Sequence, residues 1–103
     1  MIAKTPKTPY YAVVFTSITT EDGKGYNSMS DKMVELASQQ KGFLGIESAR
    51  NELGITVSYW KDLESIVKWK MNAEHSEARN LGREQWYQNF KVRICKVERD
   101  YEF

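Results

Sequence analysis

The chain has 103 residues, of which 28% are charged and 41% are hydrophobic, proportions close to those of ordinary globular domains. That length fits one domain with a single core. Fifteen basic and 14 acidic side chains give a formal net charge of +1, so no long-range field concentrates nucleic acid or an anionic membrane, and we set both aside as main partners.

Cysteine usage and the hydropathy pattern narrow the class of protein further. Cys95 is the only cysteine, which excludes an intrachain disulfide and leaves too few thiolates for a zinc or iron–sulfur site. The first residues, MIAKTPKTPYYAVVF, contain no apolar run of signal-peptide length, and nothing later approaches the ~18 apolar residues of a membrane span. We therefore expect a cytoplasmic protein with no metal.

The first elements in the chain are a tail and a strand. Pro6 and Pro9 disfavour a helix and predict an extended arm over residues 1–9, followed by a single domain over residues 10–103. The run YYAVVFTSI (10–18) is rich in aromatic and β-branched residues with little polar alternation, so it predicts a strand with both faces covered.

An amphipathic helix is predicted next. Ser28 and Asp31 form an approximate capping box, and Gly42 is placed to end the helix in a left-handed cap. Between them, residues of the buried stripe recur at helical spacing: Met29, Met33, Leu36 and Gln40.

A hairpin and a second helix follow. FLGIESARN (43–51) and ITVSYW (55–60) each have the length of a strand, and the short connection between them predicts antiparallel neighbours. Asp62 caps a helix that continues through AEHSEARNLG, with a kink or break expected near Asn72. The predicted buried stripe of this helix begins with Leu63, Ile66, Val67 and either Trp69 or Lys70.

The final segment, FKVRICKVERDYEF (90–103), alternates as a long strand does, with Phe90, Val92 and Ile94 on one face and Lys91, Arg93 and Cys95 on the other. The element order is then β-α-β-β-α-β. That order predicts an α+β, ferredoxin-like fold with both helices on one face of a four-stranded antiparallel sheet. The other face would expose apolar side chains, so we expect a second copy or a ligand to cover it and predict a homodimer.

Candidate catalytic groups lie in WKMNAEHSEARNLGREQWY (69–87), where His75, Arg79, Arg83 and Trp86 follow at spacings of four, four and three. Histidine is the natural general base near neutral pH, and an arginine can neutralise a phenolate or enolate. The alternative is a partly exposed helical histidine, with both arginines paired to neighbouring glutamates on a solvated helix face.

Large apolar side chains could form a flat pocket for an aromatic substrate. The candidate substrate-binding residues are Trp60, Trp69, Arg83, Trp86, Tyr87, Met29 and Met33. The same aromatic residues could instead pack the core or the dimer interface, where large rings are also enriched. The two methionines could equally fill gaps in the core.

Four marks lie along the second half of the chain: SYW (58–60), DLE (62–64), Trp69 with His75 and Arg79, and GREQWY (82–87) leading into VERDYEF (97–103). With these marks the chain, from about Tyr10 onward, resembles the antibiotic biosynthesis monooxygenase (ABM) superfamily. This resemblance implies a dimeric α+β barrel and a cofactor-independent monooxygenase for a small aromatic, quinol or polyketide-like substrate. It also implies a pocket role for Trp69, with His75 as the base and Arg79 as the cation.

The haem-degrading branch of that superfamily fits this chain poorly. Its iron-ligating histidine lies ten residues after the tryptophan, a position that Arg79 occupies here, and arginine cannot ligate iron. The first strand also lacks the branch's asparagine, although His75 lies one turn from the ligand position. We expect no cofactor. Haem binding stays a minor alternative, beside a non-catalytic dimer that binds a hydrophobic small molecule and a purely structural dimer.

Overall fold

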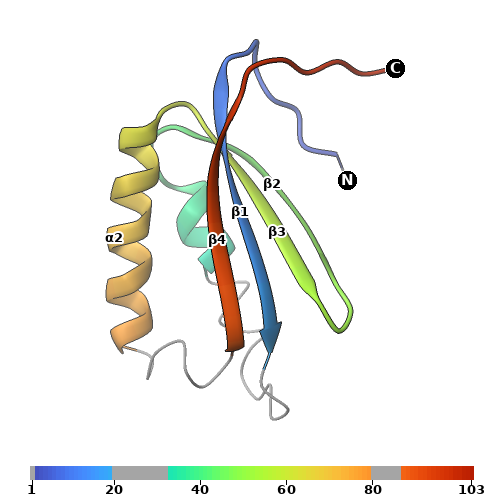
Figure 1. Cartoon of the computed structure of the whole chain (residues 1–103). Coiled ribbons are helices and arrows are strands. Elements are labelled where there is room, and N and C mark those ends of the chain that lie inside the picture. Colours follow the sequence, from blue (N-terminus) through green and yellow to red (C-terminus); the bar gives the residue numbers. More distant parts are fainter. Residues whose placement is uncertain (1, 20–32, 80–86) are drawn as a thin grey trace.

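One antiparallel sheet organises the chain. The computed structural model describes residues 2–19, 33–79 and 87–103, with side chains for 2–18, 33–73 and 89–103. The elements are β1 (Tyr10–Thr19), β2 (Phe43–Arg50), β3 (Gly54–Trp60), α2 (Leu63–Arg79) and β4 (Tyr87–Val97). The strands lie in the order β2-β3-β1-β4, and α2 and a helical segment at residues 33–38 lie on the same side of the sheet (Figure 1). The predicted ferredoxin-like α+β fold is confirmed.

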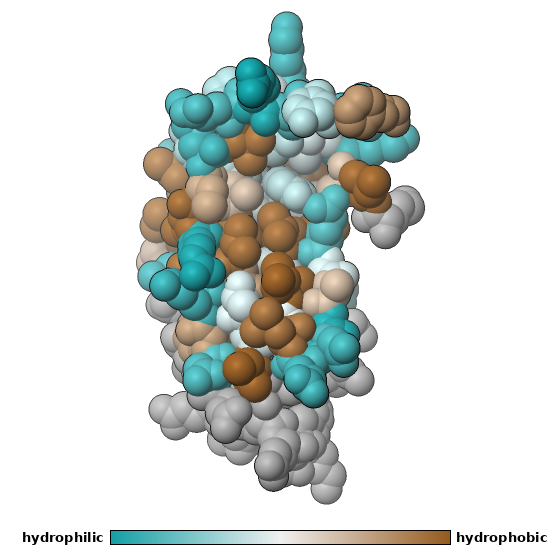
Figure 2. Space-filling view, turned by 45° about the vertical axis from the view of Figure 1, so that its right-hand side comes forward, coloured by the Kyte–Doolittle hydropathy of each residue, from teal (hydrophilic) through white to brown (hydrophobic). Residues whose placement is uncertain are grey.

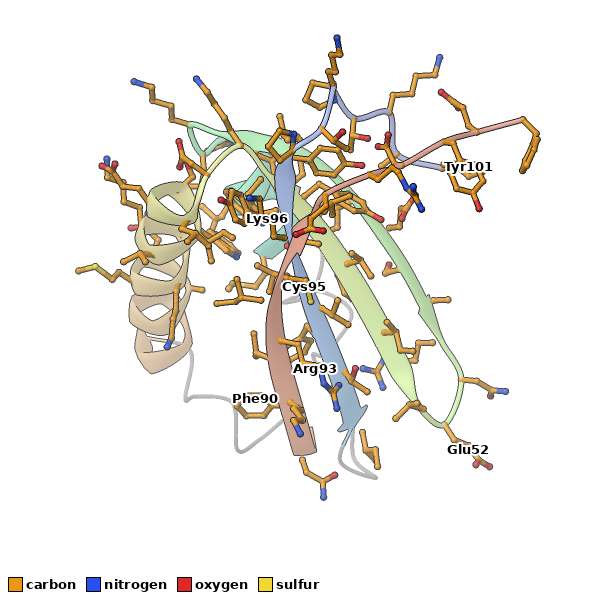
Figure 3. All side chains as sticks on the ribbon, turned by 45° about the horizontal axis from the view of Figure 1, so that its top comes forward. Glu52, Phe90, Arg93, Cys95, Lys96 and Tyr101 are labelled. Atoms are coloured by element: carbon orange, nitrogen blue, oxygen red, sulfur yellow. The ribbon has the colours of Figure 1, made fainter. Side chains whose placement is uncertain are left out.

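Strand register assigns each side chain to one of two sides, because residues directly opposite in an antiparallel pair point the same way. The helix-facing side carries Tyr11, Val13, Phe15, Ser17, Thr56, Ser58, Trp60, Phe90, Val92 and Ile94. The open side, away from α2, carries Tyr10, Ala12, Val14, Thr16, Ile18, Ile55, Val57, Tyr59, Lys91, Arg93 and Cys95. Figure 3 shows the split on β4, where Phe90 projects toward α2 and Arg93 and Cys95 project to the opposite side. The alternation predicted for the last strand is therefore confirmed.

The core lies between the sheet and the two helical segments. Its buried members are Ala37, Trp60 and Ile66, with Tyr11, Val13, Phe43 and Trp69 packed against them. Trp60 has no exposed surface, and its indole N–H donates to Ser58 Oγ at 2.9 Å. Because that hydrogen bond satisfies its one polar group, the largest side chain of β3 is buried at no polar cost.

The first helical segment stops at residue 38, so Gly42 does not end it as predicted. Gly42 lies in the turn that the backbone N–H of Phe43 closes on the carbonyl oxygen of Gln40, at 3.2 Å, and its φ is +90°. This is the left-handed region that glycine occupies without strain. A Cβ at this position would also lie 2.7 Å from Cβ of Ser65, in the first turn of α2. The carbonyl of Gly42 accepts a 2.7 Å hydrogen bond from the backbone N–H of Lys61. Glycine thus allows the turn between the first helical segment and β2 to approach the start of α2.

Helix α2 begins as the sequence predicts, because Asp62 Oδ1 accepts a 2.8 Å hydrogen bond from the backbone N–H of Ser65. The hydroxyl and then the backbone amide of Ser65 hold the pKa of Asp62 below its ordinary value. The break expected near Asn72 is absent, since α2 runs continuously to Arg79. The Asn72 side-chain amide instead donates to Gln40 Oε1 at 3.1 Å and links α2 to the end of the first helical segment.

The predicted buried stripe of α2 is partly wrong. Ile66 is 3% exposed and Trp69 is half-buried, but Leu63 and Val67 are 50% and 56% exposed. The buried residues of the first turns are Ser65 and Ile66, so the helix contacts the sheet along a narrow line. Leu63 and Val67 lie one turn apart beside that line and face solvent.

Strand β4 stops at Val97 instead of continuing to residue 103. Val97 pairs with Tyr10, the first residue of β1, and the residue before it is Pro9, which has no backbone N–H to donate. The last residue of β4 therefore pairs with the first residue of β1, and the ladder stops there. Residues 98–103 continue beyond the sheet as an exposed extended segment (Figure 1).

Candidate functional site

The two predicted catalytic residues lie in the last turns of α2, one turn apart along the helix. The side chains of His75 and Arg79 are outside the described residues. By helical spacing, positions 75 and 79 continue the series Leu63, Val67 and Met71, whose three side chains are each at least half exposed.

The predicted substrate-binding residues are only partly placed. Met29, Arg83 and Trp86 lie outside the described residues. Tyr87 begins β4 and pairs with Thr19, although its side chain is not described. Met33 is half-buried at the start of the described helical segment, on the same side of the sheet as α2.

Two of the predicted pocket tryptophans form a stack. The rings of Trp60 and Trp69 lie 6.1 Å apart at 22°, and Phe43 meets Trp60 edge-on at 5.4 Å. Trp60 is fully buried, which matches the packing alternative. Trp69 is half-buried and is therefore the indole of this pair that a ligand can contact directly.

An exposed apolar surface lies on the helix-facing side of β4. Phe90, Val92 and Ile94 are 37%, 47% and 52% exposed, although they are on the side that carries α2. The ring of Phe90 packs against that of Phe15 on β1 at 5.5 Å, which fixes the neighbouring strands' aromatic side chains relative to each other. We call Phe90, Val92 and Ile94 the apolar floor. It is an exposed apolar surface on the side of the sheet where α2 lies.

A cation beside the apolar floor was missed by the sequence reasoning. Arg50, at the end of β2, donates from its guanidinium to the carbonyl oxygen of Ser17 at 3.3 Å and to its hydroxyl oxygen. It reaches Ser17 across β3 at Gly54, where a Cβ would overlap the guanidinium. Ser17 is directly opposite Phe90 in the next strand, so the positive charge lies near one end of the apolar floor. The only sequence feature that indicates this contact is that Arg50 and Gly54 face each other across the predicted hairpin.

A second polar cluster fixes the N-terminal tail at the opposite end of the sheet, on the open side. Tyr59 donates its hydroxyl to Glu47 Oε1 at 2.6 Å, and the backbone N–H of Ala3 donates to Glu47 Oε2 at 2.8 Å. These bonds, that of Tyr59 foremost, lower the pKa of Glu47. Burial, followed by the bond to Glu47, raises the pKa of Tyr59 to about 12. The rings of Tyr10 and Tyr59 meet edge-on at 5.9 Å.

Within residues 2–19, 33–79 and 87–103, no group of three or more His, Cys, Asp or Glu side chains could hold a metal ion. In the same ranges, no helix has the length and apolar character needed to cross a membrane.

Comparison with known sequences gives one informative relative. No model of a known protein family matches the chain. It is 45% identical over 104 residues to the uncharacterised protein YqjZ of Bacillus subtilis, covering 99% of this chain and 91% of that protein. Identity at that level over nearly the whole length shows common family membership.

Several solved structures share the fold. Protein PA3566 of Pseudomonas aeruginosa superposes with a TM-score of 0.70 at 17% identity, over 91% of this chain and 97% of its own. A proposed antibiotic biosynthesis monooxygenase from Bordetella bronchiseptica gives 0.67 at 14% identity over 92% and 100%. Another, from Chloroflexus aurantiacus, gives 0.63 at 15% identity over 91% and 96%. The chain therefore belongs to the family of YqjZ and has the fold of the ABM-like proteins.

Proposed function

We propose that this protein is a cofactor-independent monooxygenase that oxidises a small aromatic, quinol or polyketide-like substrate with dioxygen. The observation that supports this most directly is the apolar floor, which stays 37% to 52% exposed on the side of the sheet where α2 lies. The likeness of the fold to proposed monooxygenases supports the same reaction class. The substrate's ring would lie on the apolar floor with Trp69 at one edge.

The reaction begins with removal of a proton from an acidic carbon or phenol of the substrate, with His75 as the base. Arg79 balances the negative charge of the resulting anion. The anion gives an electron to dioxygen, and the two radicals combine to form a substrate peroxide. When the substrate carbon is a CH2 group, loss of water from the peroxide leaves a ketone, so one oxygen atom enters the substrate and the other leaves as water. The substrate supplies all four electrons, and no external reductant is needed.

The test is oxygen uptake by the purified protein with anthrone-like and quinol substrates. His75→Gln should lower the rate at least about a hundredfold, the usual contribution of a general base. Met71→Gln is the matched control, because it lies one turn earlier in the same helical series and is 65% exposed. Uptake that is absent with every substrate, or equal in the His75 variant and the wild type, would refute the catalytic proposal.

A second candidate function is non-catalytic binding of an apolar molecule on the same floor. The observation that favours it is the helical position of His75, which continues the exposed series Leu63, Val67 and Met71. Under this alternative, an apolar fluorescent dye binds with the same affinity in the wild type and in His75→Gln. Val92→Asp, in the middle of the apolar floor, abolishes the binding, and no oxygen is consumed.

We also propose that the protein is a homodimer formed through the open side of the sheet. Figure 2 looks onto this side and shows apolar side chains gathered along its middle with hydrophilic ones at its margins. On this side, the strand register places Ile18 and Ile55, which are 39% and 42% exposed. A two-fold axis would bury this surface against its own copy. Sedimentation equilibrium at micromolar concentration should give twice the 12.0 kDa mass of the chain, and a stable monomer would refute the dimer.

A further inference from the structure

The segment after β4 is anchored at one residue and exposed beyond it. Residues 98–103, which we call the C-terminal arm, are all exposed. Within the arm, the carboxylate of Asp100 accepts a hydrogen bond from the hydroxyl of Tyr10, and Thr5 Oγ1 lies 3.5 Å from the same oxygen. The next residue, Tyr101, is 79% exposed and contacts Phe103 edge-on at 5.7 Å. The arm thus presents aromatic rings to solvent from a fixed point.

The arm extends on the open side of the sheet. In Figure 1 it leaves the top of β4 and runs away from α2, toward the side where the N-terminal tail lies, and Figure 3 places Tyr101 there. The opposite end of the same side carries Ile18, Ile55, Lys91 and Arg93, which we call the far-end patch. The arm and the far-end patch therefore share one side of the sheet but occupy its two ends.

The arm cannot cover the far-end patch of its own chain. From Tyr10 to Ile18 the strand rises about 27 Å, at ~3.4 Å per residue. The carboxylate of Asp100 is bound at Tyr10, and the Cα of Tyr101 lies only about 3.8 Å from that of Asp100. The ring of Tyr101 thus falls well short of Ile18 in the same molecule.

We propose that the C-terminal arm docks on the far-end patch of a second copy of this chain. When two open sides pack face to face with their strands running in opposite directions, the arm end of one sheet lies over the far end of the other. A two-fold axis makes the contact reciprocal, so each copy gives one arm and receives one. This inference rests on the homodimer proposed above and adds which segment and which surface form its rim.

Charge supports this pairing. The arm carries Glu98, Asp100 and Glu102 against one basic side chain, Arg99. The far-end patch carries two basic side chains, Lys91 and Arg93, which are exposed on the open side of β4. Opposite charges at the rim of an interface set its orientation and the rate of association. Strands packed in the same direction would instead bring the two basic ends together and the two acidic arms together.

Crosslinking tests the contact directly. A photoreactive phenylalanine analogue replaces Tyr101, and light and 15N-labelled heavy protein are mixed before irradiation. We expect mixed-mass crosslinks from residue 101 to peptides that contain residues 89–93 or 55. Crosslinks within single chains only, in a sample that sediments as a dimer, would overturn the docking proposal and leave the dimer intact. A sample that sediments as a monomer would overturn both.

Charge reversal gives an independent measure. Lys91→Glu with Arg93→Glu should raise the dimer dissociation constant about tenfold or more, and adding Glu98→Lys with Glu102→Lys should restore most of the affinity. The control reverses two exposed lysines elsewhere by the same total charge, Lys41→Glu and Lys61→Glu. An equal loss in the control, or no recovery in the fourfold variant, would show that the arm and the far-end patch do not meet.

Discussion

The contact between Arg50 and Ser17 depends on Gly54, and this dependence gives the sharpest test of the structure. A Cβ at position 54 would overlap the guanidinium and displace it from Ser17. Ser17 is 2% exposed, so its hydroxyl would lose a donor where little water can replace it. Leaving a buried polar group without its partner costs about 1–3 kcal/mol. Alanine is itself better than glycine in a strand by about 0.5–1 kcal/mol. Gly54→Ala should therefore lower the free energy of unfolding by up to about 2.5 kcal/mol.

Gly54→Ala should have the opposite effect on the free energy of unfolding when Arg50 is absent. An Arg50→Ala background removes the three atoms nearest to a Cβ at position 54, so Gly54→Ala should there raise the free energy of unfolding by about 0.5–1 kcal/mol. Urea denaturation of the four proteins, followed by tryptophan fluorescence, measures both values. An equal effect of Gly54→Ala in the two backgrounds would show that the glycine does not accommodate the arginine.

Three further predictions concern other parts of the fold. Gly42→Ala should lower the free energy of unfolding by about 2–5 kcal/mol, because alanine is strained in the left-handed region and its Cβ would overlap Ser65 of α2. Gly45→Ala is the control and should lower it less, as measured by urea denaturation. The hydrogen bond that Tyr59 donates lowers the pKa of Glu47 in the folded protein. The ionised carboxylate therefore stabilises the fold above the ordinary glutamate pKa, and this stabilisation is lost as the pH falls through the lowered pKa. Stability measured from pH 6 to pH 3 should fall less steeply in Glu47→Gln. Trp69→Ala should cost about 1.5–3 kcal/mol in the same urea assay, and a loss under about 0.5 would mean that its ring does not support the core.

The strands of the sheet could be predicted because the pattern that marks each strand lies within its own residues. Alternation in residues 90–97 gave the two sides of β4, and the cap residue Asp62 gave the start of α2, since it acts through its own backbone neighbours. The buried stripe of α2 was less predictable. A helical repeat shows that Leu63 and Val67 share a face, but not how wide a line of the helix the sheet will cover.

The candidate site was harder to predict because it depends on contacts between distant segments. Arg50 lies 33 residues after Ser17, and nothing in either local sequence indicates that a missing side chain at Gly54 joins them. The stacked pair of Trp60 and Trp69 was predicted as a group of aromatic residues, but its division into a fully buried and a half-buried ring follows from the packing of α2 on β3. Residue types were visible in the sequence, while their exposure was not.

Strand β4 shows why exposure matters for function. The sequence predicts that a strand with a regular apolar face buries that face, yet Phe90, Val92 and Ile94 remain 37% to 52% exposed. The opposite face of the same strand carries Lys91 and Arg93, also exposed. Charged side chains are stable in water, but the three exposed apolar side chains of the apolar floor leave hydrophobic surface uncovered in a monomer. In the two proposals made above, a small apolar ligand covers the apolar floor and a second copy of the chain covers the open side of the sheet. The two proposals therefore explain one strand from its two sides, and each can fail without the other.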